Sequence, residues 1–251
     1  MNILEARVVL RDRSVFDVLD LAIRFLVEHG RAYAKCALVV LPPAYLATYL
    51  SARFLGWGWA WTFAFVLGPF VCAPFTSLAS RLLFDEAARV RDVLRASIAA
   101  LPRLVALRIF EGVLTATIVG AFWGVPVCFF ANEVVVLERA SVGRAIARLQ
   151  RLLGGDVILA VLFLTALHIV VTFAGDAVGR GVLEDLLEVT APPSMWSTNG
   201  SGLGLAAYWL FMPYLATARF LLYINVRTRT EGWDVQTRFA ALAARAGDEA
   251  A

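Results

Sequence analysis

Residues 157–175, VILAVLFLTALHIVVTFAG, form a mostly apolar stretch that contains no acidic residue, lysine or arginine. At a helical rise of about 1.5 Å per residue, such a stretch comes close to the roughly 30 Å thickness of a bilayer's hydrocarbon core. Four further stretches are also long and apolar: 37–55, 57–80, 104–137 and 203–224. Together they predict an all-α fold, a polytopic bundle of transmembrane helices.

The composition indicates the same class of protein. Hydrophobic residues make up 60% of the 251 residues and charged residues 17%. One soluble core could not hide that much apolar surface, so we expect the lipid bilayer to cover it. Among the 23 basic residues Lys35 is the single lysine, which is typical of a high-GC bacterial genome. The arginines are spread over several segments, and the absence of one basic face argues against nucleic-acid binding.

The sequence lacks the patterns that metal binding or catalysis would need. Cys36, Cys72 and Cys128 lie in or beside apolar stretches without CxxC or Cys–His spacing, which favours buried thiols over a metal site or a disulfide. The chain has no HExxH, GxSxG, P-loop or paired acidic motif. We therefore expect no enzyme activity and no cofactor.

The amino-terminal part has the pattern of an amphipathic helix. Apolar residues recur at helical spacing between Val15 and Leu26. Ser14 is expected to cap the start of this helix, with Asp17 near the positive end of the helix dipole. We expect residues 1–32 to form this helix on the cytoplasmic side of the first span.

The distribution of arginine predicts the orientation. Six basic residues precede the first span, whereas Arg53 is the only one in the connection that follows it. The positive-inside rule then places the amino terminus in the cytoplasm and the first hairpin, with Trp57 among its three tryptophans, outside. The polar stretch 81–100, ended by Pro102, is expected to lie flat on the cytoplasmic face as an amphipathic helix.

The stretch 104–137 is too long for one ordinary span and is flanked by arginines at both ends. Both ends are therefore expected in the cytoplasm. We favour a short hairpin that turns around Gly120, Trp123, Gly124 and Pro126. Each arm would hold only about 16 residues, fewer than the usual 20 or so, so a re-entrant dip is the alternative to two full crossings.

The last pair of spans completes the predicted topology. The connection after residue 175 is acidic and turn-rich, which places it outside, with 183–189 as a short surface helix. Arginines after residue 224 return the carboxyl terminus to the cytoplasm. We predict about six spans in a bacterial inner membrane, with a transmembrane domain at 33–226 and a cytoplasmic tail at 227–251.

Two runs of sequence resemble a family. Residues 136–149, VLERASVGRAIARL, and 218–234, ARFLLYINVRTRTEGWD, are similar to segments of bacterial multi-span membrane proteins related to the glycerophosphodiester phosphodiesterase membrane domain. The resemblance implies a multi-span domain without a defined activity. Asn225 stands where an acidic residue would be usual, and the chain has no room for the soluble phosphodiesterase barrel, so its chemistry is not carried over.

Charged residues within apolar stretches are the candidate functional site, because such groups are costly in hydrocarbon. The candidates are Arg108, Glu111, Glu133, His168 and Arg219. Arg108 and Glu111, three residues apart, are expected to pair with each other. Glu133 either pairs with Arg219 or forms part of a substrate or proton site. His168 either packs as a hydrogen-bonded residue, which we favour, or shuttles protons.

A second set of candidates would contact lipid headgroups from amphipathic helices, with a solvated helix surface as the alternative. These are Arg89, Arg95, Arg144, Arg148, Arg227 and Arg229. The small residues Gly112, Ala116 and Gly120, four apart, are expected to permit close helix packing, either within the fold or against another protein.

By elimination, we expect a non-enzymatic scaffold or accessory subunit of the membrane. It would act through lipid contacts or through a partner membrane protein or a second copy of the chain. The alternative is a transporter or permease subunit for a small molecule or lipid. A transporter requires a polar cavity that joins Glu133, His168 and Arg219, whereas a scaffold requires these groups to be paired in a packed interior.

Overall fold

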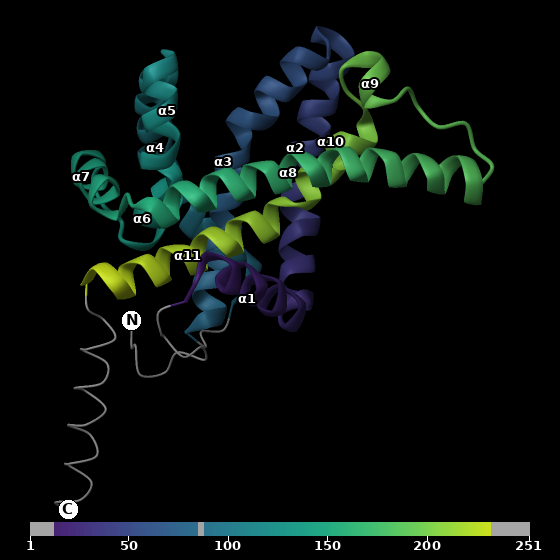
Figure 1. The fold of residues 1–251 in the computed structure, drawn as a ribbon. Coiled ribbons are helices and arrows are strands. Elements are labelled where there is room, and N and C mark those ends of the chain that lie inside the picture. Colours follow the sequence, from purple (N-terminus) through teal and green to yellow (C-terminus); the bar gives the residue numbers. More distant parts are fainter. Residues whose placement is uncertain (1–12, 85–87, 232–251) are drawn as a thin grey trace, which may run out of the picture.

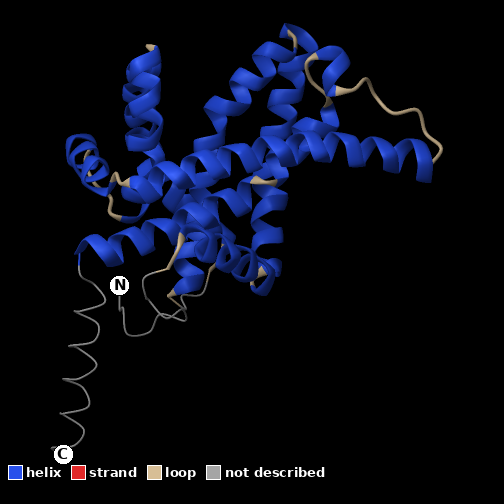
Figure 2. Ribbon diagram, viewed as in Figure 1, coloured by secondary structure: helices blue, strands red, loops and turns tan. Residues whose placement is uncertain are grey.

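A computed structural model describes residues 13–84 and 88–231, and every regular element in these ranges is a helix (Figures 1 and 2). The elements are α1 (Val15–Glu28), α2 (Gly30–Leu55), α3 (Trp57–Leu83), α4 (Val90–Thr115), α5 (Ile118–Val127), η2 (Cys128–Phe130), α6 (Ala131–Leu137), α7 (Val142–Leu152), α8 (Gly155–Gly181), η3 (Val182–Leu186), α9 (Met195–Thr198), α10 (Gly202–Leu210) and α11 (Met212–Glu231). The predicted all-α class is confirmed for these residues. Most of the predicted tail 227–251 lies outside them.

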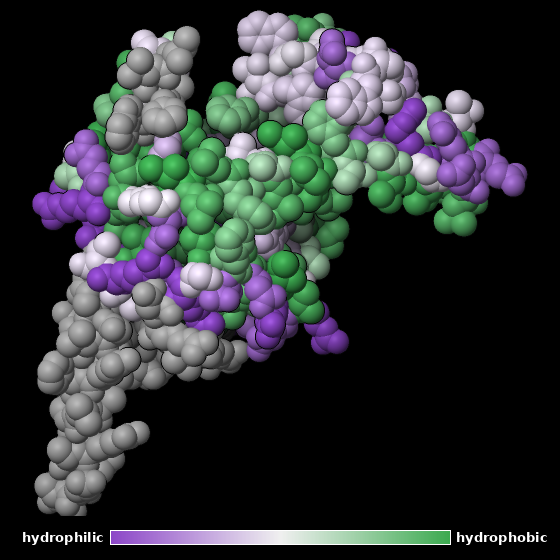
Figure 3. Space-filling model, in the orientation of Figure 1, coloured by the Kyte–Doolittle hydropathy of each residue, from purple (hydrophilic) through white to green (hydrophobic). Residues whose placement is uncertain are grey.

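Four helical segments are long and apolar enough to cross a membrane: 30–55, 57–83, 155–186 and 202–230. The interiors of α3 and α11 are largely buried, whereas α2 and α8 expose apolar side chains such as Leu38 and Leu162. In Figure 3 an apolar band crosses the face shown, with hydrophilic residues at its lower left edge and its right end. These features fit a membrane-embedded protein with α3 and α11 at its centre.

The amino-terminal helix is present but shorter than the predicted range 1–32, because α1 covers Val15–Glu28 and residues 30–32 belong to α2. Residues 1–12 lie outside the described part of the chain. Ser14 caps α1 by accepting a hydrogen bond from the backbone N–H of Asp17 at 3.2 Å. One stripe of α1, which includes Val18, Ala22 and Phe25, is buried. The helix packs along α11, with which it has most of its tertiary contacts (Figure 1). This stripe is therefore covered by protein, whereas Phe16 and Ile23 of the same helix are exposed.

The stretch 104–137 doubles back, but not where the sequence predicted. The chain turns at Ala116 and Thr117, where Thr117 caps α5 by accepting from the N–H of Gly120. The predicted turn residues 120–126 lie inside α5 instead. The α4–α5 hairpin stands apart from the paired helices α2 and α3 in Figure 1. The turn is thus a short connection at a capping threonine, and the Gly- and Pro-rich segment predicted to turn is helical.

The predicted surface helix at 81–100 is wrong in its boundaries. Residues up to Leu83 belong to α3, and α4 continues through Pro102 to Thr115 as one helix. Proline removes one helical hydrogen bond, but Ser97, Ala100 and Leu104 form one buried stripe across that position. Packing on both sides of Pro102 offsets the missing bond, so the helix is not ended there.

The helix that begins the last pair of spans is also longer than predicted. Residues after 175 continue α8 to Gly181 and then η3, a π-helical turn at 182–186, in place of the separate surface helix predicted at 183–189. Gly175 and Gly179 do not interrupt α8, because they face Ala207 and Leu203 of the neighbouring α10. A side chain at Gly175 would collide with Ala207. These glycines therefore permit close helix packing.

Candidate functional site

Four of the five predicted polar residues come together from three helices in the interior. Arg108 and Glu111 lie on α4, Glu133 lies on α6 and Arg219 lies on α11. Glu133 has no solvent-exposed surface, and Arg219 is 8% exposed. Since unpaired charges in such a place would be very unfavourable, the contacts of each group decide what the site can do.

One half of the site is organised around Arg108. Its guanidinium forms an ion pair with Glu111, as the spacing predicted, and donates a hydrogen bond at 2.8 Å to the amide oxygen of Asn132. The amide nitrogen of Asn132 donates in turn to the backbone carbonyl of Pro69 on α3, at 2.6 Å. This chain of contacts ties the α4–α5 hairpin to α3 through α6.

The other half of the site is the predicted pair between Glu133 and Arg219. A guanidinium nitrogen of Arg219 lies 3.2 Å from a carboxylate oxygen of Glu133. The same nitrogen donates to the backbone carbonyl of Phe129, and the guanidinium lies 5.0 Å from the centre of the Phe129 ring. The second oxygen of Glu133 accepts from Thr76 at 3.5 Å. The carboxylate therefore has a partner on each oxygen.

The four charges balance, with two arginines and two glutamates. The remaining donors are the Nε–H groups of Arg108 and Arg219, which are buried and have no acceptor in the protein. A buried donor without a partner is unfavourable by about 1–3 kcal/mol, and a buried water molecule commonly satisfies it. The network thus leaves two positions where a small polar molecule would be stabilised.

His168 is separate from these charges. It lies on α8, and its Nε2–H donates to the backbone carbonyl of Tyr208 at 3.2 Å. The ring nitrogen is the donor because a carbonyl oxygen can only accept. Its ring stacks on Tyr208 with 4.4 Å between centroids and contacts Phe211 as well. These contacts are those of a packing residue, the interpretation that the sequence favoured.

The six headgroup candidates fall into two sets. Arg89, Arg95 and Arg144 are exposed. Arg148 and Arg227 both contact Glu138, at 3.3 and 3.2 Å, and Arg229 forms an ion pair with Asp156. The second set therefore holds α7, α8 and α11 together at the end of the bundle that the arginines predict to be cytoplasmic.

Glu138 is a further charged residue with several partners, and it was not among the predicted site residues. Its carboxylate also accepts from the hydroxyl of Tyr223, and Arg227 donates to that hydroxyl at 3.2 Å. Nearby on α11, the side chain of Asn225 bonds both the backbone N–H and the carbonyl of Arg13, at 3.1 and 3.0 Å. Glu138, Tyr223, Asn225 and Arg227 all lie within residues 136–149 and 218–234, the two runs that the sequence analysis singled out.

A second overlooked group lies at the opposite end of the bundle. Asp176 of α8 is buried, and its carboxylate accepts from the hydroxyl of Ser201 and from the backbone N–H of Met195 at 3.2 Å. Ser201 also caps α10 by accepting from Gly204 at 2.9 Å. The acidic character of this loop had indicated only solvent exposure, whereas Asp176 anchors the connection to α8.

No protein-family model, curated protein or solved structure matches this chain. Within residues 13–84 and 88–231, no group of three or more His, Cys, Asp or Glu side chains is arranged to hold a metal ion.

Proposed function

We propose that this protein is a non-enzymatic scaffold or accessory subunit of the bacterial inner membrane, acting through protein or lipid contacts. The observation that carries the proposal is the pairing of the interior charges. Glu133 is bound by Arg219 and Thr76, while Arg108 is bound by Glu111 and Asn132. Charges that satisfy one another hold helices together and leave little capacity for a substrate.

The exposed surface supports the same proposal. Arg89, Arg95 and Arg144 are available to a headgroup or to an acidic partner. We also propose six membrane passages with both termini in the cytoplasm, the α4–α5 hairpin being the short or re-entrant pair. Kinship with membrane proteins related to the glycerophosphodiester phosphodiesterase membrane domain is a further proposal, which rests on the resemblance of residues 136–149 and 218–234.

A transporter is the second candidate, and one observation favours it. The Nε–H groups of Arg108 and Arg219 are buried without an acceptor. In a transporter, water or a polar substrate would reach them from one side of the membrane. The two functions therefore differ in whether water enters the interior.

Cys72 is a natural reporter for this difference. It is buried on α3, one helical turn before Thr76, whose hydroxyl donates to Glu133. In a variant that keeps only this cysteine (Cys36→Ala, Cys128→Ala), a hydrophilic maleimide should leave Cys72 unmodified in native membranes and modify it after denaturation in detergent. Rapid modification in the native protein would refute the packed interior and favour transport.

The control adds Cys72→Ala and Ser141→Cys to the same background, since Ser141 is exposed. This variant should react in the native state. A photo-cross-linking residue in place of Arg144 then tests the scaffold directly: we expect one discrete protein adduct or a lipid adduct, whereas a residue with no binding role would give only diffuse products.

A further inference from the structure

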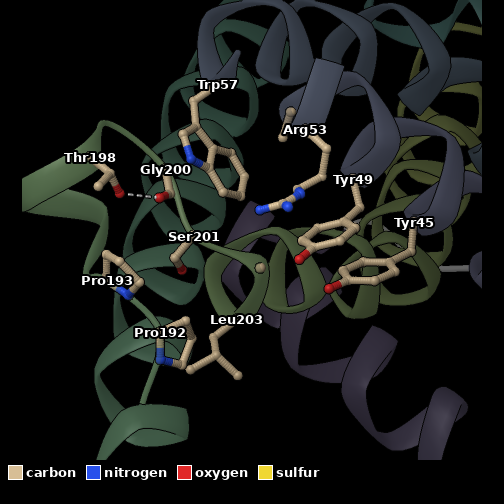
Figure 4. A pocket seen from close by; sticks show the side chains of 12 residues that line it. Tyr45, Tyr49, Arg53, Trp57, Pro192, Pro193, Thr198, Gly200, Ser201 and Leu203 are labelled. Atoms are coloured by element: carbon tan, nitrogen blue, oxygen red, sulfur yellow. Dashed lines mark hydrogen bonds between the residues drawn. The ribbon is translucent and has the colours of Figure 1, made fainter. Parts of the chain in front are cut away.

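A cavity of about 420 Å³ lies where α2 passes into α3, away from the interior charges. It lies between the last turns of α2, the start of α3, the loop that precedes α10 and the first turn of α10 (Figure 4). Its volume is within the range of roughly 300–1,000 Å³ that is usual for small-molecule sites. The function proposed above does not use this cavity.

Aromatic rings form much of its wall. The rings of Tyr45 and Tyr49, one turn apart on α2, are stacked with 5.7 Å between centroids and 10° between planes. Trp57 lies against Gly200, where a side chain would collide with the indole ring. A Cβ at Gly202 would lie 3.2 Å from the hydroxyl of Tyr45. The two glycines thus bring the loop and the start of α10 against the aromatic wall.

Arg53 is the only charged residue among the described residues that line the cavity. Figure 4 shows its guanidinium directed between Tyr49 and Trp57, toward the side of Ser201. Within the described part of the chain, no acidic side chain forms an ion pair with Arg53. The carboxylate of Asp176 is near this cavity because it accepts a hydrogen bond from the lining residue Ser201, and it also accepts from the backbone N–H of Met195. The positive charge of Arg53 is therefore available to a ligand.

The surroundings indicate the kind of ligand. A guanidinium binds phosphate and carboxylate oxygens with two parallel hydrogen bonds. The hydroxyls of Tyr45 and Tyr49 are directed into the same cavity (Figure 4). The cavity lies near the end of a helix that is long and apolar enough to cross a membrane, where lipid phosphates are found. Leu46 and Leu50 of α2, next to the cavity residues in sequence, are exposed and could contact an acyl chain.

We propose that this cavity binds a phosphate ester, with Arg53 as the anion-binding residue and Tyr45, Tyr49 and Trp57 enclosing the attached organic group. The phosphate belongs either to the headgroup of a membrane lipid or to a soluble phosphate ester. Both sources share the chemistry at Arg53, and they differ in whether an acyl chain contributes to binding.

Native mass spectrometry of the detergent-solubilised full-length protein tests the proposal with three probes. Phosphatidylglycerol carries the phosphate and the chains, diacylglycerol carries the chains alone, and glycerol 3-phosphate carries the phosphate alone. Arg53→Gln should weaken phosphatidylglycerol binding by about tenfold or more, as expected for loss of a charge-assisted hydrogen bond. Arg53→Lys, which keeps the charge but loses the paired donors, should give an intermediate affinity.

The matched control is Arg31→Gln, an exposed arginine at the opposite end of the same helix. Its affinity for phosphatidylglycerol should equal that of the wild type. Tight, Arg53-dependent binding of phosphatidylglycerol but not diacylglycerol supports a lipid source, and equal Arg53-dependent binding of glycerol 3-phosphate supports a soluble source. If Arg53→Gln, with unchanged thermal unfolding, binds both phosphate probes as the wild type does, the proposal is overturned.

Discussion

At the scale of single residues, the pair of Arg219 and Glu133 offers a direct test of how the interior is stabilised. Arg219→Met would leave the fully buried carboxylate of Glu133 without its cation. We expect the free energy of unfolding to fall by about 3–5 kcal/mol, the usual effect of removing one partner of a buried ion pair. Thermal unfolding in mild detergent, followed by tryptophan fluorescence, measures the change.

The double variant Arg219→Met, Glu133→Leu removes both charges and should recover most of the lost stability, because no uncompensated charge stays buried. Arg24→Ala is the control. Its ion pair with Asp20 has a similar geometry, at 2.8 Å, but both side chains are largely exposed. An exposed pair contributes no more than about 1 kcal/mol. If Arg219→Met is as mild as this control, the pair does not hold the bundle together.

The same residues show what the sequence could predict at this scale. Spacing alone paired Arg108 with Glu111, because residues three apart share one face of a helix whatever the tertiary structure. Charges are scarce in the apolar segments, so the sequence offers few partners for Glu133, and Arg219 is one of them. The hydrogen bond from Asn132 to the carbonyl of Pro69 was not predicted, because it depends on how α3 and α6 are placed relative to each other. No local pattern in the sequence specifies that placement.

At the scale of helices, the α4–α5 hairpin depends on one close backbone contact. A Cβ at Gly120 of α5 would collide with the backbone carbonyl of Leu114 on α4, whereas nothing lies within 4 Å of one at Gly112. The small residues spaced four apart therefore do not form one packing face, because the turn separates Gly112 from Gly120. Gly120 serves packing within the fold.

Two matched substitutions test this assignment. Gly120→Ala should separate the arms of the hairpin and lower the unfolding temperature, while Gly112→Ala should be neutral or stabilising by up to about 1 kcal/mol, as expected for alanine in a helix. Thermal unfolding in detergent gives both values. Equal effects of the two substitutions would show that the arms are not in close contact.

Helix boundaries were the least predictable feature at this scale, and the reason is physical. In an isolated helix, proline and glycine both favour an end to the helix, because proline lacks a backbone N–H and glycine has a mobile backbone. The predicted helix ends at Pro102 and Gly175 rest on this preference. Here Pro102 lies between Ala100 and Leu104, which are both buried. Gly175 lies against Ala207 of α10. Tertiary packing outweighs the local preference in both places, and a single sequence does not reveal which neighbours a helix will have.

At the scale of the whole molecule, the predicted orientation rests on the arginine-rich borders. Arg148, Arg227 and Arg229 gather at one end of the bundle through Glu138 and Asp156. The buried Asp176 and the cavity of Arg53 lie at the other end, where α2 meets α3 and α8 meets the loop before α10. Since charge bias decides which end stays in the cytoplasm, the first end should be cytoplasmic and the second outside.

Cysteine labelling from each side of the membrane tests this orientation. Single cysteines are introduced as Ser141→Cys, Thr230→Cys and Ser197→Cys, all at exposed positions, after the three native cysteines have been replaced by alanine. In intact spheroplasts an impermeant maleimide should modify the cysteine at position 197 alone, and in inside-out vesicles the cysteines at 141 and 230 alone. Positions 141 and 230 are joined through α8 and α10–α11, so an even number of crossings separates them. If the cysteines at 141 and 230 were modified from opposite sides, an odd number of crossings would have to separate them. That result would refute the topology, whatever the depth of the α4–α5 hairpin.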